Sequence, residues 1–81
     1  MELIDNTLTE LLILDGVETK ILSNYSYNQY KTLIMELTKI KYNTNDNNSK
    51  IIIYSILNSN MKLYEFLSDF EISDDLLKIT M

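Results

Sequence analysis

Apolar and polar positions follow two competing patterns in the first part of the chain. Apolar, partly β-branched residues stand on both sides of Asp15-Gly16. Asp-Gly in this setting is a strong hairpin signal, because a type I′ turn needs positive φ at both of its central residues. The pattern therefore predicts β-strands at about 9–14 and 17–22.

An amphipathic helix over residues 7–14 is the competing interpretation of the same segment. Thr7 and Glu10 match a capping box, and Gly16 suits a helix end. Apolar residues also recur at the i, i+4, i+7, i+8 spacing of one helical face, namely at Ile4, Leu8, Leu11 and Leu12. We favour the hairpin.

The period becomes clearly helical after Ser23-Asn24. Ser26 with Gln29 matches a capping box, and apolar residues then follow an i, i+3, i+4, i+7, i+10 pattern, so residues 27–42 are predicted to form an amphipathic helix. Its polar side includes Glu36 and Lys39, which are close enough to pair. The core positions predicted for this helix are Tyr30, Leu33, Ile34, Leu37 and Ile40.

The second half reads as short helices after a polar loop. The asparagine-rich stretch at about 43–49 indicates a mobile surface loop inside a single domain, residues 1–81. Helices are expected at about 50–58, 61–70 and from Ser73 to about Ile79, although the β-branched run within 51–57 also fits a strand. The predicted fold is thus α+β, an N-terminal hairpin packed with three to four helices, and the alternative is an all-α bundle.

Composition removes most catalytic chemistry. The chain has no arginine, histidine or cysteine and a single glycine. It therefore lacks the usual general base near neutral pH, the soft metal ligand and the phosphate-cradling loop. We expect no enzymatic activity, no cofactor and no metal site. The absence of alanine, arginine and proline beside abundant asparagine and isoleucine indicates an AT-rich genome, such as that of a low-GC bacterium, its phages or plasmids, or a virus.

Charge is distributed unevenly along the chain, whose net charge is −5. Residues 1–19 carry five carboxylates and no lysine, residues 20–62 carry six lysines and two carboxylates, and residues 63–81 carry five carboxylates and one lysine. Such a chain should be repelled by nucleic acid and by anionic membranes, so a protein with a basic surface is the expected partner. The acidic start and the lack of a long apolar run predict a cytoplasmic protein, in the host cytoplasm if a phage or virus encodes it.

The candidate partner-binding residues lie in an acidic C-terminal segment and at the start of the best helix. Carboxylates there could meet a basic partner around phenylalanine anchors, and tyrosines are enriched at protein interfaces. A solvated helix face with a well-capped terminal turn would explain the same acids without any function. The candidates are Glu65, Phe66, Asp69, Phe70, Glu71, Asp74, Asp75, Tyr25 and Tyr27.

These features favour a small, non-enzymatic, acidic binding protein of a virus, phage or mobile element. Such a protein would act stoichiometrically on a protein partner, for example as an inhibitor of host defence such as an anti-CRISPR. The alternative is a structural or assembly subunit of a phage particle that self-associates into a homo-oligomer through hairpin edges and tyrosines.

Overall fold

The computed structural model describes residues 2–81, with the side chains of residues 17–19 outside the description. These residues form five helices and no β-strand. The chain therefore matches the all-α alternative and not the predicted α+β fold. The helices are α1 (Glu2–Ile21), α2 (Asn24–Tyr42), α3 (Asn47–Ser59), α4 (Met61–Ser68) and α5 (Ser73–Thr80).

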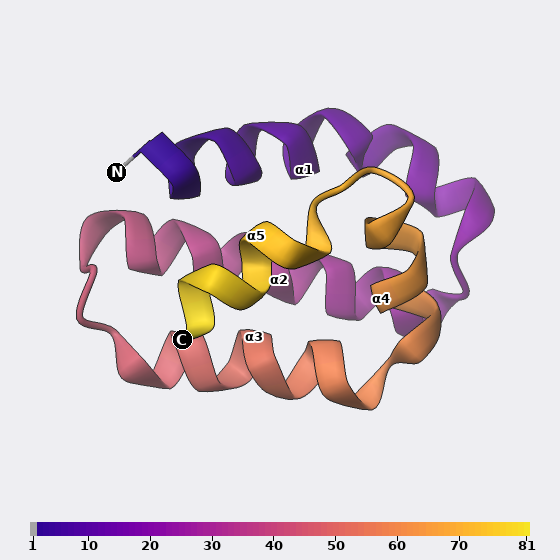
Figure 1. The fold of residues 1–81 in the computed structure, drawn as a ribbon. Helices are drawn as coiled ribbons and strands as arrows, with labels where there is room; N and C mark the ends of the chain where they lie inside the picture. The colour runs from indigo at the N-terminus through magenta and orange to yellow at the C-terminus, as the bar shows by residue number, and fades with distance from the viewer. Residues whose placement is uncertain (1) are drawn as a thin grey trace.

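The helices are arranged in two layers (Figure 1). α1, α2 and α3 run antiparallel side by side, with α2 in the middle. α5 packs against both α1 and α3, and α4 packs against α2, α3 and α5. One end of the molecule therefore holds the α1–α2 connection and α4, and the other holds the start of α1, the α2–α3 connection and the end of α5 (Figure 1).

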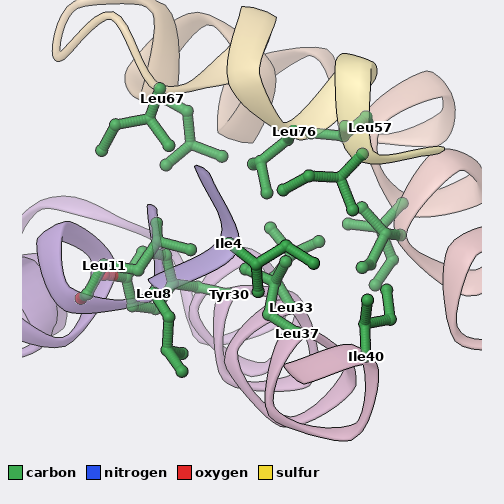
Figure 2. Close-up of a cluster of buried hydrophobic side chains, with 14 of the residues drawn as sticks. Ile4, Leu8, Leu11, Tyr30, Leu33, Leu37, Ile40, Leu57, Leu67 and Leu76 are labelled. Atoms are coloured by element: carbon green, nitrogen blue, oxygen red, sulfur yellow. The ribbon is translucent and has the colours of Figure 1, made fainter. Parts of the chain in front are cut away.

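Every helix contributes apolar side chains to one core (Figure 2). The predicted core face of α2 is confirmed, since Tyr30, Leu33, Leu37 and Ile40 are fully buried and Ile34 is half-buried. Removing this stripe from water is the main force that holds the central helix in place. The other buried apolar residues are Ile4, Leu8, Leu11, Ile53, Ile56, Leu57, Leu63, Leu67, Ile72, Leu76 and Ile79.

The predicted hairpin is wrong. Residues 9–14 and 17–22 do not form strands, because α1 runs through Asp15-Gly16 to Ile21 as a continuous helix. No glycine has positive φ in the described part of the chain, so the type I′ turn does not form. The competing interpretation, a helix over residues 7–14, had the right type of secondary structure, but α1 is longer and runs from Glu2 to Ile21.

Packing of the N-terminal segment explains why the turn signal failed. Ile4, Leu8 and Leu11 lie on one helical face and are all buried, at 1%, 7% and 0% exposure. Tertiary burial of such a stripe outweighs the local preference of one dipeptide. Thr7, read as a cap in the helical interpretation, is instead buried in the middle of α1.

Several boundaries in the second half also differ from those predicted. α3 begins at Asn47, so only residues 43–46 of the predicted loop lie outside a helix, and residues 51–57 are helical rather than a strand. Asp46 caps α3 by accepting a hydrogen bond from the Ser49 amide at 3.1 Å. α4 ends at Ser68, two residues earlier than expected.

The start of α2 shows how burial moves a cap. The N-cap is Ser23, whose Oγ accepts from the Ser26 amide at 3.2 Å. Ser26 was the predicted cap, but it is buried, and its hydroxyl accepts a hydrogen bond from Asn60 Nδ2 at 3.1 Å. This bond ties the start of α2 to the connection between α3 and α4.

Candidate functional site

The turn between α4 and α5 exposes part of the predicted acidic segment. The Glu71 amide donates to the Ser68 carbonyl at 2.9 Å, and the Ile72 amide donates to the Leu67 carbonyl at 3.1 Å. This pair of bonds is a Schellman motif, which requires a left-handed residue after the helix. Glu71 takes that conformation, with φ of 59°. Four backbone groups therefore fix the turn.

The two phenylalanines of the segment have different surroundings. Their rings pack edge to face, with centroids 5.1 Å apart and planes at 61°. Phe66 is half-buried and packs against the core, whereas Phe70 is 42% exposed. Ile72, two residues further on, is fully buried. Phe70 is therefore the more available apolar anchor.

Phe70 borders a hollow formed between α1 and the turn, which we call the α1–turn hollow. Glu10, Ile13 and Leu14 line it from α1, and Phe70 and Ile72 line it from the turn. Its volume is about 170 Å³. Ile13 is 73% exposed, so this apolar surface is open to solvent.

Phe66 lines a second hollow, which we call the α4 hollow. Its volume is about 490 Å³. The predicted residues Glu65, Phe66 and Asp69 line it together with Lys62. Because Lys62 is present, the α4 hollow is lined by charges of both signs. The remaining lining residues come from the α1–α2 connection and the first turn of α2: Ile21, Leu22, Ser23 and Ser26.

Asp74 and Asp75 lie in the first turn of α5, as the sequence predicted. Asp74 is exposed and Asp75 is half-buried. Ser73 does not cap this helix, since its hydroxyl shares a 2.9 Å hydrogen bond with that of Ser68 and the N-cap position is Ile72. The carboxylates of Asp74 and Asp75 suit the positive end of the helix dipole, and neither residue lines either hollow.

The predicted tyrosines, Tyr25 and Tyr27, form their hydrogen bonds with residues of α1 and α2 and not with the acidic turn. The Tyr27 hydroxyl donates to Asp15 Oδ1 at 3.1 Å, and Lys31 Nζ lies 2.7 Å from Asp15 Oδ2 and 5.2 Å from the Tyr27 ring centre. The hydrogen bond from Lys31 lowers the pKa of Asp15, and the same bond raises the pKa of Lys31. Tyr25 is 64% exposed and accepts a hydrogen bond from Gln29. Tyr27 therefore fastens α2 to α1, and neither tyrosine lines the two hollows.

Glu36 differs from its expected position. Its predicted pairing with Lys39 is confirmed, with 3.1 Å between Lys39 Nζ and Glu36 Oε1. The side chain is buried rather than on the polar side of α2, however, and Oε2 has no hydrogen-bond partner. Neither hollow includes it.

Sequence reasoning missed the contribution of α1 to the site. Glu10 and Ile13 were assigned to a strand, and neither was a candidate for binding. The available signal was helical: Ile13 falls off the stripe that Ile4, Leu8 and Leu11 form, so a helix leaves this large apolar residue at the surface. Leu12, which the helical interpretation placed on that stripe, is instead 54% exposed. Lys62, which offsets the carboxylates of the α4 hollow, was also outside the predicted set.

The described side chains contain no group of three or more histidines, cysteines or carboxylates placed to hold a metal ion. None of the helices within residues 2–81 combines the length and the apolar character needed to cross a membrane. Comparisons with protein-family models, with curated proteins and with solved structures found no match. Both hollows combine apolar side chains with carboxylates.

Proposed function

We propose that this chain is a non-catalytic binding protein that occupies a basic surface of a partner protein. The observation that carries the proposal is the turn after α4, where Asp69, Phe70 and Glu71 are all exposed in succession. Carboxylates favour association with a basic surface, and an aromatic side chain supplies the apolar contact that dominates many interfaces.

The rigidity of the turn strengthens the proposal. The backbone hydrogen bonds of the Schellman motif hold the turn, and Ile72 anchors it in the core. A surface that is already ordered loses less conformational entropy on binding than a flexible loop does. The exposed turn is therefore better suited to recognition than a flexible acidic tail.

Composition supports the non-catalytic and stoichiometric part of the proposal. The chain offers no imidazole, thiol or guanidinium group, and these groups perform most acid–base, nucleophilic and phosphate chemistry in enzymes. The biological setting we propose is the cytoplasm of a host cell, where a virus, phage or mobile element encodes the chain as an inhibitor of host defence such as an anti-CRISPR. The acidic net charge and a residue composition typical of an AT-rich genome support this setting.

Affinity capture with matched charge variants tests the proposal. The immobilised wild type is compared with Asp69→Lys/Glu71→Lys and with a control, Glu2→Lys/Asn6→Lys/Asn45→Lys, which has the same net charge but alters exposed sites elsewhere. The proposal expects a protein retained in a fixed stoichiometry by the wild type and the control, lost from the turn variant, and released as salt rises. Equal retention by all three baits contradicts it.

A self-associating particle subunit remains the second candidate, on a new basis. The hairpin edges it relied on do not form, but α3 exposes Ile51 and Tyr54 at 61% and 52%. Both line a hollow of about 400 Å³ that also includes Met81. This candidate expects concentration-dependent oligomers in analytical ultracentrifugation that Ile51→Ser disrupts, and a strictly monomeric wild type at millimolar concentration contradicts it.

A further inference from the structure

We propose that the α1–turn hollow receives one large apolar side chain from an amphipathic helix of the partner whose flanking residues are lysine or arginine. This inference rests on the proposed function and deepens it, because it names the part of the surface and the kind of segment that docks there. Exposed apolar area, charge and volume each support it.

The first support is the apolar surface that α1 and the turn leave open together. Ile13 is 73% exposed on α1, off the buried stripe, and Leu14 beside it in the hollow is half-buried. Phe70 adds a partly exposed ring from the turn. Contiguous apolar residues at a surface hollow are typical of interaction sites, whereas single exposed apolar residues are ordinary.

The second support is the charge around this surface. Glu10 lines the hollow, and the exposed Glu71 stands in the chain between Phe70 and Ile72, which both line it. No lysine lines it among the side chains that the structure describes, in contrast to the α4 hollow, where Lys62 is present. An apolar site with acidic residues around it selects an apolar anchor between cationic neighbours.

The backbone conformation of Glu71 also supports the proposal. A left-handed residue is accommodated most easily by glycine and next by asparagine. The chain contains nine asparagines, yet a glutamate stands at this position with φ of 59°. Strain retained in the fold is commonly linked to function, here to a carboxylate beside Phe70.

The third support is the volume of the hollow. At about 170 Å³ it is smaller than the roughly 300–1,000 Å³ typical of small-molecule sites. It matches the scale of a single leucine, methionine or phenylalanine side chain. A helix laid along α1 could insert one such residue and keep its charged residues near the acidic edge.

Charge argues against a second copy of this chain as the occupant. Two copies joined through this face about a two-fold axis would present the same surface to each other. Glu10 and Glu71 of both copies would then lie in one interface, and juxtaposed like charges disfavour association. The cationic helix is therefore the occupant we assign.

A synthetic peptide provides the test without knowledge of the natural partner. The probe is a fluorescein-labelled helical peptide of leucine and lysine, with leucines at i, i+3, i+4 and i+7, and its control has the same composition in scrambled order. Fluorescence anisotropy measures the affinity of each for the full chain. We expect the amphipathic peptide to bind and the scrambled peptide to bind at least about ten-fold more weakly, because only the former aligns its leucines on one face.

Substitutions then locate the binding site. Ile13→Ser should weaken binding about ten-fold or more, which corresponds to loss of most of one buried aliphatic contact. Its matched control is Ile51→Ser, an exposed isoleucine on α3. Glu10→Gln/Glu71→Gln should weaken binding several-fold at low salt and less at high salt, whereas Glu2→Gln should have no effect. Circular dichroism confirms that each variant is folded.

Each other outcome overturns the inference in a distinct way. Failure of the wild type to bind the amphipathic peptide removes the assigned segment, and equal losses from Ile13→Ser and Ile51→Ser remove the site. If Ile13→Ser has no effect while the charge changes do, binding is electrostatic only, so the inference fails while the proposed function stands. Sedimentation that shows a dimer of the wild type and a monomer of Ile13→Ser would assign the face to a second copy instead.

Discussion

Large aliphatic residues occur on both faces of α1, and their burial differs between the two faces. On one face Ile4, Leu8 and Leu11 are buried in the core (Figure 2), and on the other Leu12 and Ile13 are more than half exposed. Leu11 and Leu12 are neighbours in sequence with identical side chains. Position in the helical period, rather than hydrophobicity, decides which residues hold the fold together and which are free to bind something else.

Truncation of one residue on each face gives the largest predicted contrast. Leu11→Ala should lower the free energy of unfolding by about 2–5 kcal/mol, because it leaves a cavity in a packed core. Ile13→Ala should change it by no more than about 0.5 kcal/mol, since the side chain is mostly in water. Urea denaturation measures both, and similar losses would show that the outer face also carries the fold.

Glu71→Gly separates stability from binding at the turn next to the outer face of α1. Glycine adopts the left-handed conformation freely, so this variant should be more stable by about 0.5–1 kcal/mol while it binds the cationic peptide less well. Glu65→Gly, in the middle of α4, should instead lose about 0.5–1 kcal/mol, because glycine is a poor helix former. Thermal unfolding distinguishes them, and a destabilised Glu71→Gly would contradict the left-handed turn.

Gly16→Ala tests the continuity of α1, on which the distinction between the two faces depends. A Cβ at this position would meet nothing within 4 Å. In a helix the substitution should therefore stabilise the protein by about 0.4–1 kcal/mol. In a type I′ hairpin turn, where glycine has positive φ, alanine would destabilise it, so the sign of the change decides between the two structures.

The smallest predicted effect concerns the ion pair between Lys31 of α2 and Asp15 of α1. Lys31 lowers the pKa of Asp15 in the folded chain relative to its ordinary value of 3.8. The resulting stabilisation is fully present above that value and is lost as pH falls through the lowered pKa. Asp15→Asn should have a slightly lower midpoint of thermal unfolding than the wild type at pH 7 and the same midpoint near pH 2. A difference that persists at pH 2 would indicate a cause other than ionisation.

The sequence predicted the parts of the fold in which one periodic signal acts alone. Residues 27–42 have a clear 3.6-residue period with no competing turn dipeptide, and the helix and its apolar core positions were correct, although α2 begins earlier, at Asn24. Around Asp15-Gly16 a local turn preference competed with the apolar stripe of α1. The stripe prevails only because α2 and α5 cover it, and this covering is a tertiary property that local sequence does not reveal.

The candidate site was predictable only in part, for a similar reason. The acidic segment and its phenylalanines were singled out from the sequence, and the structure places Asp69, Phe70 and Glu71 of that segment at an exposed turn. Phe70 and Phe66 line two different hollows, to which the fold adds Ile13 and Lys62 respectively. Ile13 lies far from Phe70 in sequence, so only the fold could connect them.

The most direct test of the account is to map the peptide contact on the protein by NMR. Amide and isoleucine methyl spectra of labelled protein are followed during titration with the amphipathic leucine–lysine peptide. The account predicts the largest shifts at Glu10, Ile13, Phe70 and Glu71, with Ile51 and the α2–α3 connection unchanged. Shifts centred on α3, or spread evenly over all acidic residues, would contradict docking on the outer face of α1.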